Sequence, residues 1–192
     1  MKFWIVAGAA AVSLGLAFAA GHDIHAQLLG QTSEQATVDP SMTMPPGYRD
    51  WPLISVAAVG PPLNDLRAKL GNDIAMSDLR QATIPYRDGA IIARLAWKQT
   101  TDDQTSNAFR LQAQQVGLSA DAIAKLLSQS FVAGGATNVQ FMVKDSNKYA
   151  STGGWGFAQF TNGKPDAIVQ QRCFACHEPA KATDFVFTHY SP

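Results

Sequence analysis

Cysteine and histidine are scarce in this chain of 192 residues, which has two cysteines and four histidines. Two cysteines exclude the multi-disulfide frameworks that hold many small secreted domains together. Neither sign of charge is in excess, because 15 basic side chains balance 15 acidic ones. A net charge of zero gives no electrostatic reason to expect nucleic acid or an anionic membrane surface as a partner. The composition is that of an ordinary globular protein, and the length indicates one domain.

The longest apolar run lies at the start of the chain, where residues 3–20 follow a single basic residue, Lys2. Small residues at 17–19 end the run. This pattern predicts a secretory signal peptide over residues 1–26, removed on export to a bacterial periplasm. An uncleaved anchor is the alternative, because about 18 apolar residues is near the lower limit for a membrane span. After cleavage we expect no membrane attachment, and a polar, flexible lead-in over residues 27–47.

Turn signals divide the rest of the chain into short segments. Strands are predicted at residues 51–57, 90–98, 137–144, 155–160 and 184–190. Helices are predicted at residues 63–70, 74–80 and 165–171 and after the N-cap residue Ser119, with a loop at 100–107. In the strand at 90–98, Ile91, Leu95 and Trp97 share a face suited to the core, opposite Arg94 and Lys98. Strands without a repeating βαβ rhythm favour an α+β fold, mainly an antiparallel sheet with flanking helices.

Both cysteines lie in one short stretch near the end, Cys173-Phe174-Ala175-Cys176-His177. A disulfide between Cys173 and Cys176 would close a very small loop and gain little stability. A thioredoxin-like dithiol belongs to the first helix after a strand in a βαβ unit, which is not predicted here. A zinc site needs four ligands, and beyond the leader only His177 and His189 can join the two cysteines.

The spacing Cys-x-x-Cys-His is also the attachment motif for haem c. Residues three apart on a helix share a face, so Cys173 and Cys176 can reach both vinyl groups of one porphyrin. The adjacent His177 is then placed to ligate the iron. The sequence therefore predicts one covalent haem c per chain, bound through Cys173 and Cys176, with His177 as the metal ligand.

A ligand for the opposite side of the iron is harder to find. Met142 lies in a predicted strand and is expected to pack in the core. His189 follows the motif and is expected at the surface. We therefore expect an open or weakly closed sixth position that binds a small gaseous or nitrogenous ligand. The alternative is a six-coordinate cytochrome that transfers electrons to a partner cytochrome.

Four blocks of sequence resemble the cytochrome P-460 family, which includes the c′-beta cytochromes: YRDW, YRDGAIIARLAWK, FVAGGATNVQFMVKDSNKYASTGGWGFAQF and CFACHEPAKATDFVFTHY. The resemblance covers residues 48–190 and implies a haem domain over residues 48–192. It implies a mostly β, α+β fold, a homodimer, one c-type haem on the C-terminal motif and a vacant distal side. Residues 101–130 are longer than the usual connection in this family.

The resemblance also implies two branches of function. P-460 proper oxidises hydroxylamine and has a lysine bonded to the porphyrin edge, whereas c′-beta members lack that bond and bind nitric oxide or carbon monoxide. Counted from the Asp88-Gly89 turn, Arg94 stands at the position of that lysine. With pKa values of about 10.4 for lysine and about 13.8 for arginine, arginine far more rarely offers the neutral nitrogen that a cross-link needs. Enzyme activity is thus uncertain and disfavoured, and Lys98 approaches the haem only if the register of the strand differs.

Two further residues are candidates for the distal side. If the face of Arg94 lines the haem pocket, its guanidinium can donate hydrogen bonds to a bound ligand or a haem propionate. Its alternative is a solvated strand face. Gln140, in the next strand, is either a distal donor or an outward polar residue, and a glutamine cannot accept a proton as the carboxylate of the enzymes would. The preferred interpretation is a periplasmic mono-haem cytochrome that binds small ligands such as nitric oxide.

Overall fold

The computed structural model describes residues 39, 42–167 and 170–191. The chain divides into two units, of which the second, Ala36–Pro192, contains all of these residues. The predicted signal peptide lies outside the described residues, and so does most of the predicted lead-in. Among the residues that are described, no helix is long and apolar enough to cross a membrane.

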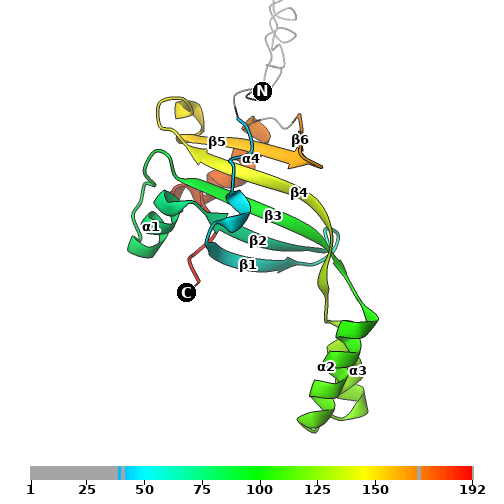
Figure 1. The fold of residues 1–192 in the computed structure, drawn as a ribbon. Helices are drawn as coiled ribbons and strands as arrows, with labels where there is room; N and C mark the ends of the chain where they lie inside the picture. Colours follow the sequence, from blue (N-terminus) through cyan, green and yellow to red (C-terminus); the bar gives the residue numbers. More distant parts are fainter. Residues whose placement is uncertain (1–38, 40–41, 168–169, 192) are drawn as a thin grey trace, which may run out of the picture. The chain divides into compact units, whose positions relative to one another are not determined.

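A six-stranded antiparallel sheet forms the centre of the second unit (Figure 1). The strands follow one another in chain order, so each pairs with its neighbours in sequence. They are β1 (Leu53–Val59), β2 (Asp65–Gly71), β3 (Ile91–Thr100), β4 (Val132–Lys144), β5 (Trp155–Thr161) and β6 (Lys164–Pro165). The tight turn between β5 and β6 is Asn162-Gly163, where both residues have positive φ. The predicted α+β fold with a mainly antiparallel sheet is confirmed.

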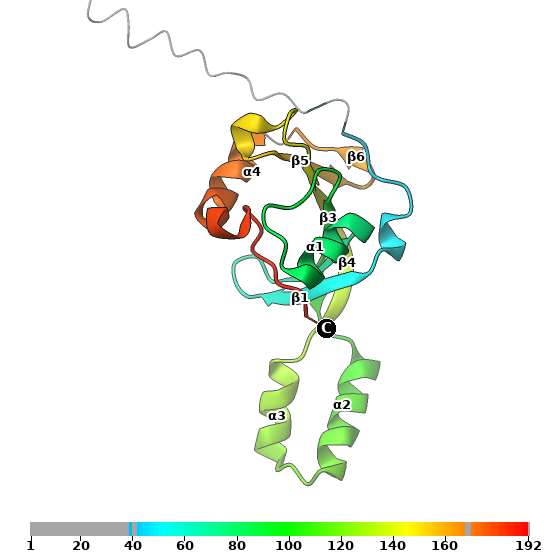
Figure 2. The same ribbon diagram turned by 90° about the vertical axis from the view of Figure 1, so that its left-hand side faces the viewer.

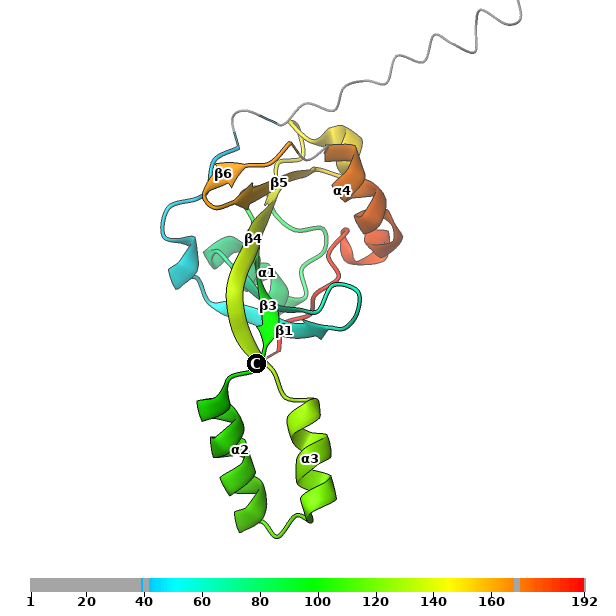
Figure 3. The same cartoon turned by 90° about the vertical axis from the view of Figure 1, so that its right-hand side faces the viewer.

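Four helices are described besides this sheet, two of which extend away from it (Figure 2). They are α1 (Asp73–Gln81), α2 (Asp103–Gln115), α3 (Ala120–Ser128) and α4 (Gln170–His177), with short 3₁₀ helices η1 (Tyr48–Asp50), η2 (Ala150–Thr152) and η3 (Glu178–Thr183). The predicted cap is confirmed, because the Ser119 hydroxyl accepts a bond from Ala122 N at the start of α3. Helices α2 and α3 form a hairpin in the connection between β3 and β4 (Figure 2). Helix α4 contacts β5, as Figure 3 shows.

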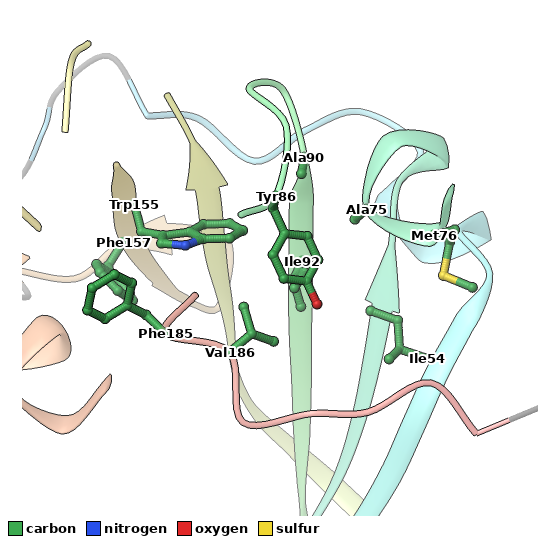
Figure 4. Close-up of a cluster of buried hydrophobic side chains, with 10 residues drawn as sticks. All are labelled: Ile54, Ala75, Met76, Tyr86, Ala90, Ile92, Trp155, Phe157, Phe185 and Val186. Carbon is green, nitrogen blue, oxygen red and sulfur yellow. The ribbon is translucent and has the colours of Figure 1, made fainter. Parts of the chain in front are cut away.

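The central strand β3 buries side chains on both of its faces. On one face, Ala93 and Leu95 pack with Phe141 and with the segment that carries Tyr48. On the other, Ile92 belongs to a cluster built around Trp155 (Figure 4). Cys173 and Phe174 of α4 pack against this second cluster. The sheet therefore has an α4 side, to which Ile92 points, and an opposite side covered by the N-terminal segment.

The prediction of a helix at residues 63–70 is wrong, because this stretch contains β2. Its residues pair with β1 on one side and with β3 on the other. The backbone N–H and C=O groups of the strand therefore find hydrogen-bond partners along both of its edges. The sequence also has a period of two, since Leu66, Ala68 and Leu70 alternate with charged residues. Leucines at 63, 66 and 70 fit a helix as well, so the local sequence is compatible with both structures. Pairing with the neighbouring strands selects the strand.

Three other predictions of local structure need correction. The loop at 100–107 is short, because β3 reaches Thr100 and α2 begins at Asp103, capped by the Asp102 carboxylate. The helix at 165–171 begins later, since Pro165 ends β6 and α4 starts at Gln170. Residues 184–190 form no strand. Asp184 and Phe185 have φ values of 51° and 65°, which are incompatible with extended backbone.

The turn at Gly153 offers a test of how tightly the C-terminal segment packs. Gly153 has φ of 66°, and a Cβ there would overlap the ring of Phe185. Gly163 has φ of 76° with nothing within 4 Å of an added Cβ. We expect Gly163→Ala to cost about 1–2 kcal/mol of unfolding free energy for its backbone conformation.

Gly153→Ala is expected to cost about 1–3 kcal/mol more than Gly163→Ala, because of the added overlap. Urea denaturation of the two variants measures the difference. Equal losses would contradict the packing of Phe185 against this turn.

Candidate haem-binding site

Helix α4 is fixed at its start by the side chain of Gln170. The Gln170 amide oxygen accepts a hydrogen bond from Phe157 N at 2.8 Å. Its amide nitrogen donates to the Trp155 carbonyl at 2.7 Å and to the Thr152 hydroxyl at 3.1 Å. One glutamine thus ties the first turn of α4 to the first residues of β5. The cysteine motif occupies the remaining turns of the helix.

The two cysteines lie three residues apart on α4 and are both free thiols. A disulfide between them is therefore not formed. Cys173 is half-buried against the cluster around Trp155, whereas Cys176 is exposed. Burial, and then the nearby Cys176, raise the pKa of the Cys173 thiol. The structure thus leaves both sulfur atoms available for covalent bonds.

The side chain of His177 is held on three sides. Its Nδ1 atom lies 2.7 Å from the Phe185 carbonyl oxygen. The rings of Phe157 and Phe187 flank the imidazole, each with its centroid 5.0 Å from that of His177. Because a carbonyl can only accept, Nδ1 must carry the proton of this bond. In the neutral imidazole, Nε2 then keeps a free lone pair, which is the state that ligates a metal.

The electrostatic surroundings favour this neutral form. Burial is the largest cause that lowers the pKa of His177, and the positive charge of Arg94 lowers it further. The bond to Phe185 acts in the opposite direction. The net shift is downward, so the ring has its metal-binding protonation state at neutral pH.

The Phe185 carbonyl is itself positioned by a buried ion pair. The Lys144 ammonium lies 2.8 and 2.9 Å from the two carboxylate oxygens of Asp184, and the two side chains are only 3% and 7% exposed. Asp184 also accepts a bond from Tyr86 N, and its carbonyl accepts one from the Trp155 indole, both at 2.8 Å. These bonds hold residues 184 and 185 in their left-handed conformation. Burial, and then the charge of Asp184, raise the pKa of Tyr86 to about 12.

Arg94 lies on the α4 side of the sheet. It lies two residues after Ile92 on β3, and residues two apart on a strand share a face. Both side chains therefore point to the α4 side. The guanidinium donates to the Asn138 side-chain oxygen at 2.7 Å, but its Nε atom is buried without a partner among the described residues. Burial, and then Arg67, lower the pKa of Arg94 to about 10, so it stays charged at neutral pH. The solvated-face alternative therefore does not describe this residue.

The other predicted residues are placed as follows. Gln140 pairs with Arg94 in the β3–β4 register and donates its amide to the Gln159 side chain. Lys98 is exposed near the end of β3. Met142 packs against the cluster around Trp155. His189 is exposed. The structure thus brings Arg94, Gln140 and Met142 to the α4 side.

A pocket of about 330 Å³ lies elsewhere in the fold. It is lined by residues such as Tyr48, Trp97 and Phe160, which pack on the side opposite α4. Its lining includes no residue of α4. In the described part of the chain, no group of three or more histidine, cysteine, aspartate or glutamate side chains is placed to hold a metal ion.

The residues around α4 fit a haem group in their chemistry. Two free thiols, an imidazole with a free Nε2 and an orphaned buried guanidinium nitrogen are what a covalent, carboxylate-bearing porphyrin would require. The sequence identified the motif and Arg94. It missed Lys144 and Asp184, since a lysine in a strand and an aspartate forty residues later carry no local signal of pairing.

Comparison with known proteins agrees with this assignment. Residues 45–188 match the sequence profile of the family described as Cytochrome P460. A search of curated proteins found no match to the chain. The match spans η1 to η3 and includes both cysteines and His177.

Asp184→Asn tests the ion pair that positions Phe185. Removing one charge leaves the buried Lys144 ammonium uncompensated, so we expect the free energy of unfolding to fall by about 3–5 kcal/mol in urea denaturation. The control is Asp88→Asn, because Asp88 is exposed and accepts bonds from Ser146 just after β4. The free energy of unfolding should fall much less in Asp88→Asn. Equal losses in the two variants would contradict a stabilising role for the buried Lys144–Asp184 pair.

Proposed function

This chain belongs to the cytochrome P460 family, whose members carry a haem cofactor, and from that premise we propose an exported mono-haem c-type cytochrome that binds a small ligand such as nitric oxide. Cys173 and Cys176 would hold the porphyrin through thioether bonds. His177 would ligate the iron through Nε2. When bound, the haem supplies a redox-active iron that takes up diatomic ligands.

The arrangement of His177 is the observation that carries this proposal. A histidine that ligates iron is usually oriented by a bond from its other ring nitrogen to a carbonyl or carboxylate. The Nδ1–Phe185 bond of 2.7 Å meets that requirement, on the same helix as two free thiols. The rings of Phe157 and Phe187 restrict rotation of the imidazole about its axis.

An open sixth position is supported by the side chains on the α4 side of the sheet. Arg94, Asn138 and Gln140 are neighbours there, and they carry guanidinium and amide groups. Such groups are poor iron ligands beside histidine or methionine, but they are good hydrogen-bond donors. A ligand bound on that side would meet donors rather than a competing metal ligand.

Hydroxylamine oxidation remains the alternative enzyme function. Arg94 stands at the position that the resemblance gives to the cross-linking lysine, so the lysine amine that forms that bond in the enzymes is missing there. Gln140 provides no carboxylate. Lys98 is exposed, and the β3 register places Arg94 rather than Lys98 opposite Gln140. These observations favour ligand binding over catalysis.

A six-coordinate electron-transfer cytochrome is the second alternative, and one observation favours it. Met142 pairs with Ile92 and Phe157 in the sheet register, and its side chain therefore lies on the α4 side. A methionine there is a potential axial ligand. A partner cytochrome would then be the electron acceptor.

A periplasmic location and a homodimer are also part of the proposal, on the basis of the apolar N-terminal run and the family resemblance.

Covalent attachment is tested directly on the intact protein. We expect acid–acetone to leave the pigment on denatured wild-type protein, and the peptide that contains Cys173 and Cys176 to carry the mass of one porphyrin. The double variant Cys173→Ser, Cys176→Ser should release any pigment that it binds. Extraction of the pigment from the wild type would contradict the thioether bonds.

Carbon monoxide tests the sixth position. Added to the reduced protein, it should shift the Soret band, and Met142→Leu should leave the ferrous spectrum before addition unchanged, because Met142 packs in the core. His189→Gln is the control for an exposed donor. A low-spin ferrous spectrum that is lost in Met142→Leu would establish the electron-transfer alternative. Turnover of hydroxylamine in the presence of an electron acceptor would establish the enzyme alternative.

A further inference from the structure

Strand β2 places a row of charges on the α4 side of the sheet. Lys69 is the direct partner of Arg94 in the β2–β3 register, so the two side chains share that side. Arg67 and Asp65 follow at intervals of two residues and share it as well. Three half-buried cations and one half-buried carboxylate are thus neighbours on this face, and the exposed Lys98 pairs with Asp65 at the end of the row.

The charges in this row are not balanced. The Arg67 guanidinium is bonded to the Asp65 carboxylate, with three contacts of 3.1 Å. Among the described residues, Arg94 bonds only the neutral side chain of Asn138. Lys69 has no carboxylate within ion-pair distance among the described residues. Two adjacent positive charges therefore lack a counter-charge.

This imbalance is unfavourable without a ligand. Burial, and then the charges of Arg67 and Arg94, lower the pKa of Lys69. The buried Nε of Arg94 has lost its hydration and gained no acceptor among the described residues, which is unfavourable for a polar group. An anion that bound both residues would offset the repulsion and satisfy the orphaned donor.

The geometry narrows the chemistry of that anion. A guanidinium presents its N–H groups as a planar fork that matches the two oxygens of a planar oxyanion. An ammonium beside it adds a point charge without directional preference. Arg94 is also near enough to Cys173 and His177 to affect the pKa of both. The anion would therefore lie on the iron-binding side of the fold.

We propose that Arg94 and Lys69 form an oxyanion-binding site on the sheet opposite His177, an inference that rests on the proposed haem function. The shared chemistry is a planar group with two oxygens. It comes either from the carboxylates of the porphyrin or from a small free anion such as nitrite that approaches the iron.

The experiment compares Arg94→Gln, Lys69→Gln and Lys98→Gln in the haem-loaded protein. Lys98→Gln is the matched control, because it removes one positive charge from the same strand and face as Arg94 at an exposed position. Two quantities are measured for each variant: the affinity of the ferric protein for nitrite by absorption titration, and the ratio of ferric to ferrous haem at a fixed potential.

A free oxyanion site predicts that nitrite affinity falls about tenfold or more in Arg94→Gln and Lys69→Gln, since hydrogen bonds to charged groups are the strong ones. If the site instead binds the porphyrin carboxylates, the nitrite affinity of the two variants should change little. The ferric-to-ferrous ratio then rises about tenfold, which corresponds to about 59 mV, because loss of nearby positive charge favours the ferric state.

If the site binds the porphyrin carboxylates, Arg94→Lys should retain the wild-type ratio of ferric to ferrous haem, because it keeps the positive charge and loses only the planar guanidinium. The proposal is overturned if Arg94→Gln and Lys69→Gln match Lys98→Gln in both measurements. If the wild type carries no haem, the proposed function fails separately, and the site is tested with formate. Formate should then raise the melting temperature of the wild type but not of Arg94→Gln, and equal shifts would overturn the site alone.

Discussion

A hydrogen bond between His177 and the Phe185 carbonyl depends on the buried ion pair of Lys144 and Asp184. The pair holds the left-handed turn at 184–185, and that turn presents the carbonyl to the imidazole. Burying two charges is costly, but removing one partner is costlier still, so the turn is strongly specified once the sheet has formed. The metal-binding state of the histidine is thus set by residues outside the cysteine motif.

The two sides of the site come from different parts of the chain and differ in character. Helix α4 supplies the thiols and the imidazole, and the sheet supplies the opposing surface. That surface is apolar near Ile92 and Phe157 and becomes cationic at Arg94 and Lys69. A porphyrin, apolar over its ring and anionic at its carboxylates, has the same two-part character. This match supports the proposed haem position without depending on the motif.

The incorrect helix at 63–70 shows where sequence patterns become ambiguous. Leucines spaced by three and four residues fit a helix, yet alternate charges in the same stretch fit a strand with one polar face. Pairing with both β1 and β3 selects the strand, and those partners are not adjacent in any local window. The error mattered for function, because a helix would have scattered the charges that β2 aligns beside Arg94.

The sequence by itself determined the features that depend on near neighbours. The spacing of Cys173, Cys176 and His177 needs only one helical turn, and the antiparallel order of the strands follows from connections between consecutive segments. Tertiary structure alone decided which carbonyl orients His177, that Arg94 faces α4 and that Lys69 lies beside it. Those outcomes depend on strand register and on contacts such as that between residues 144 and 184, which no periodicity encodes.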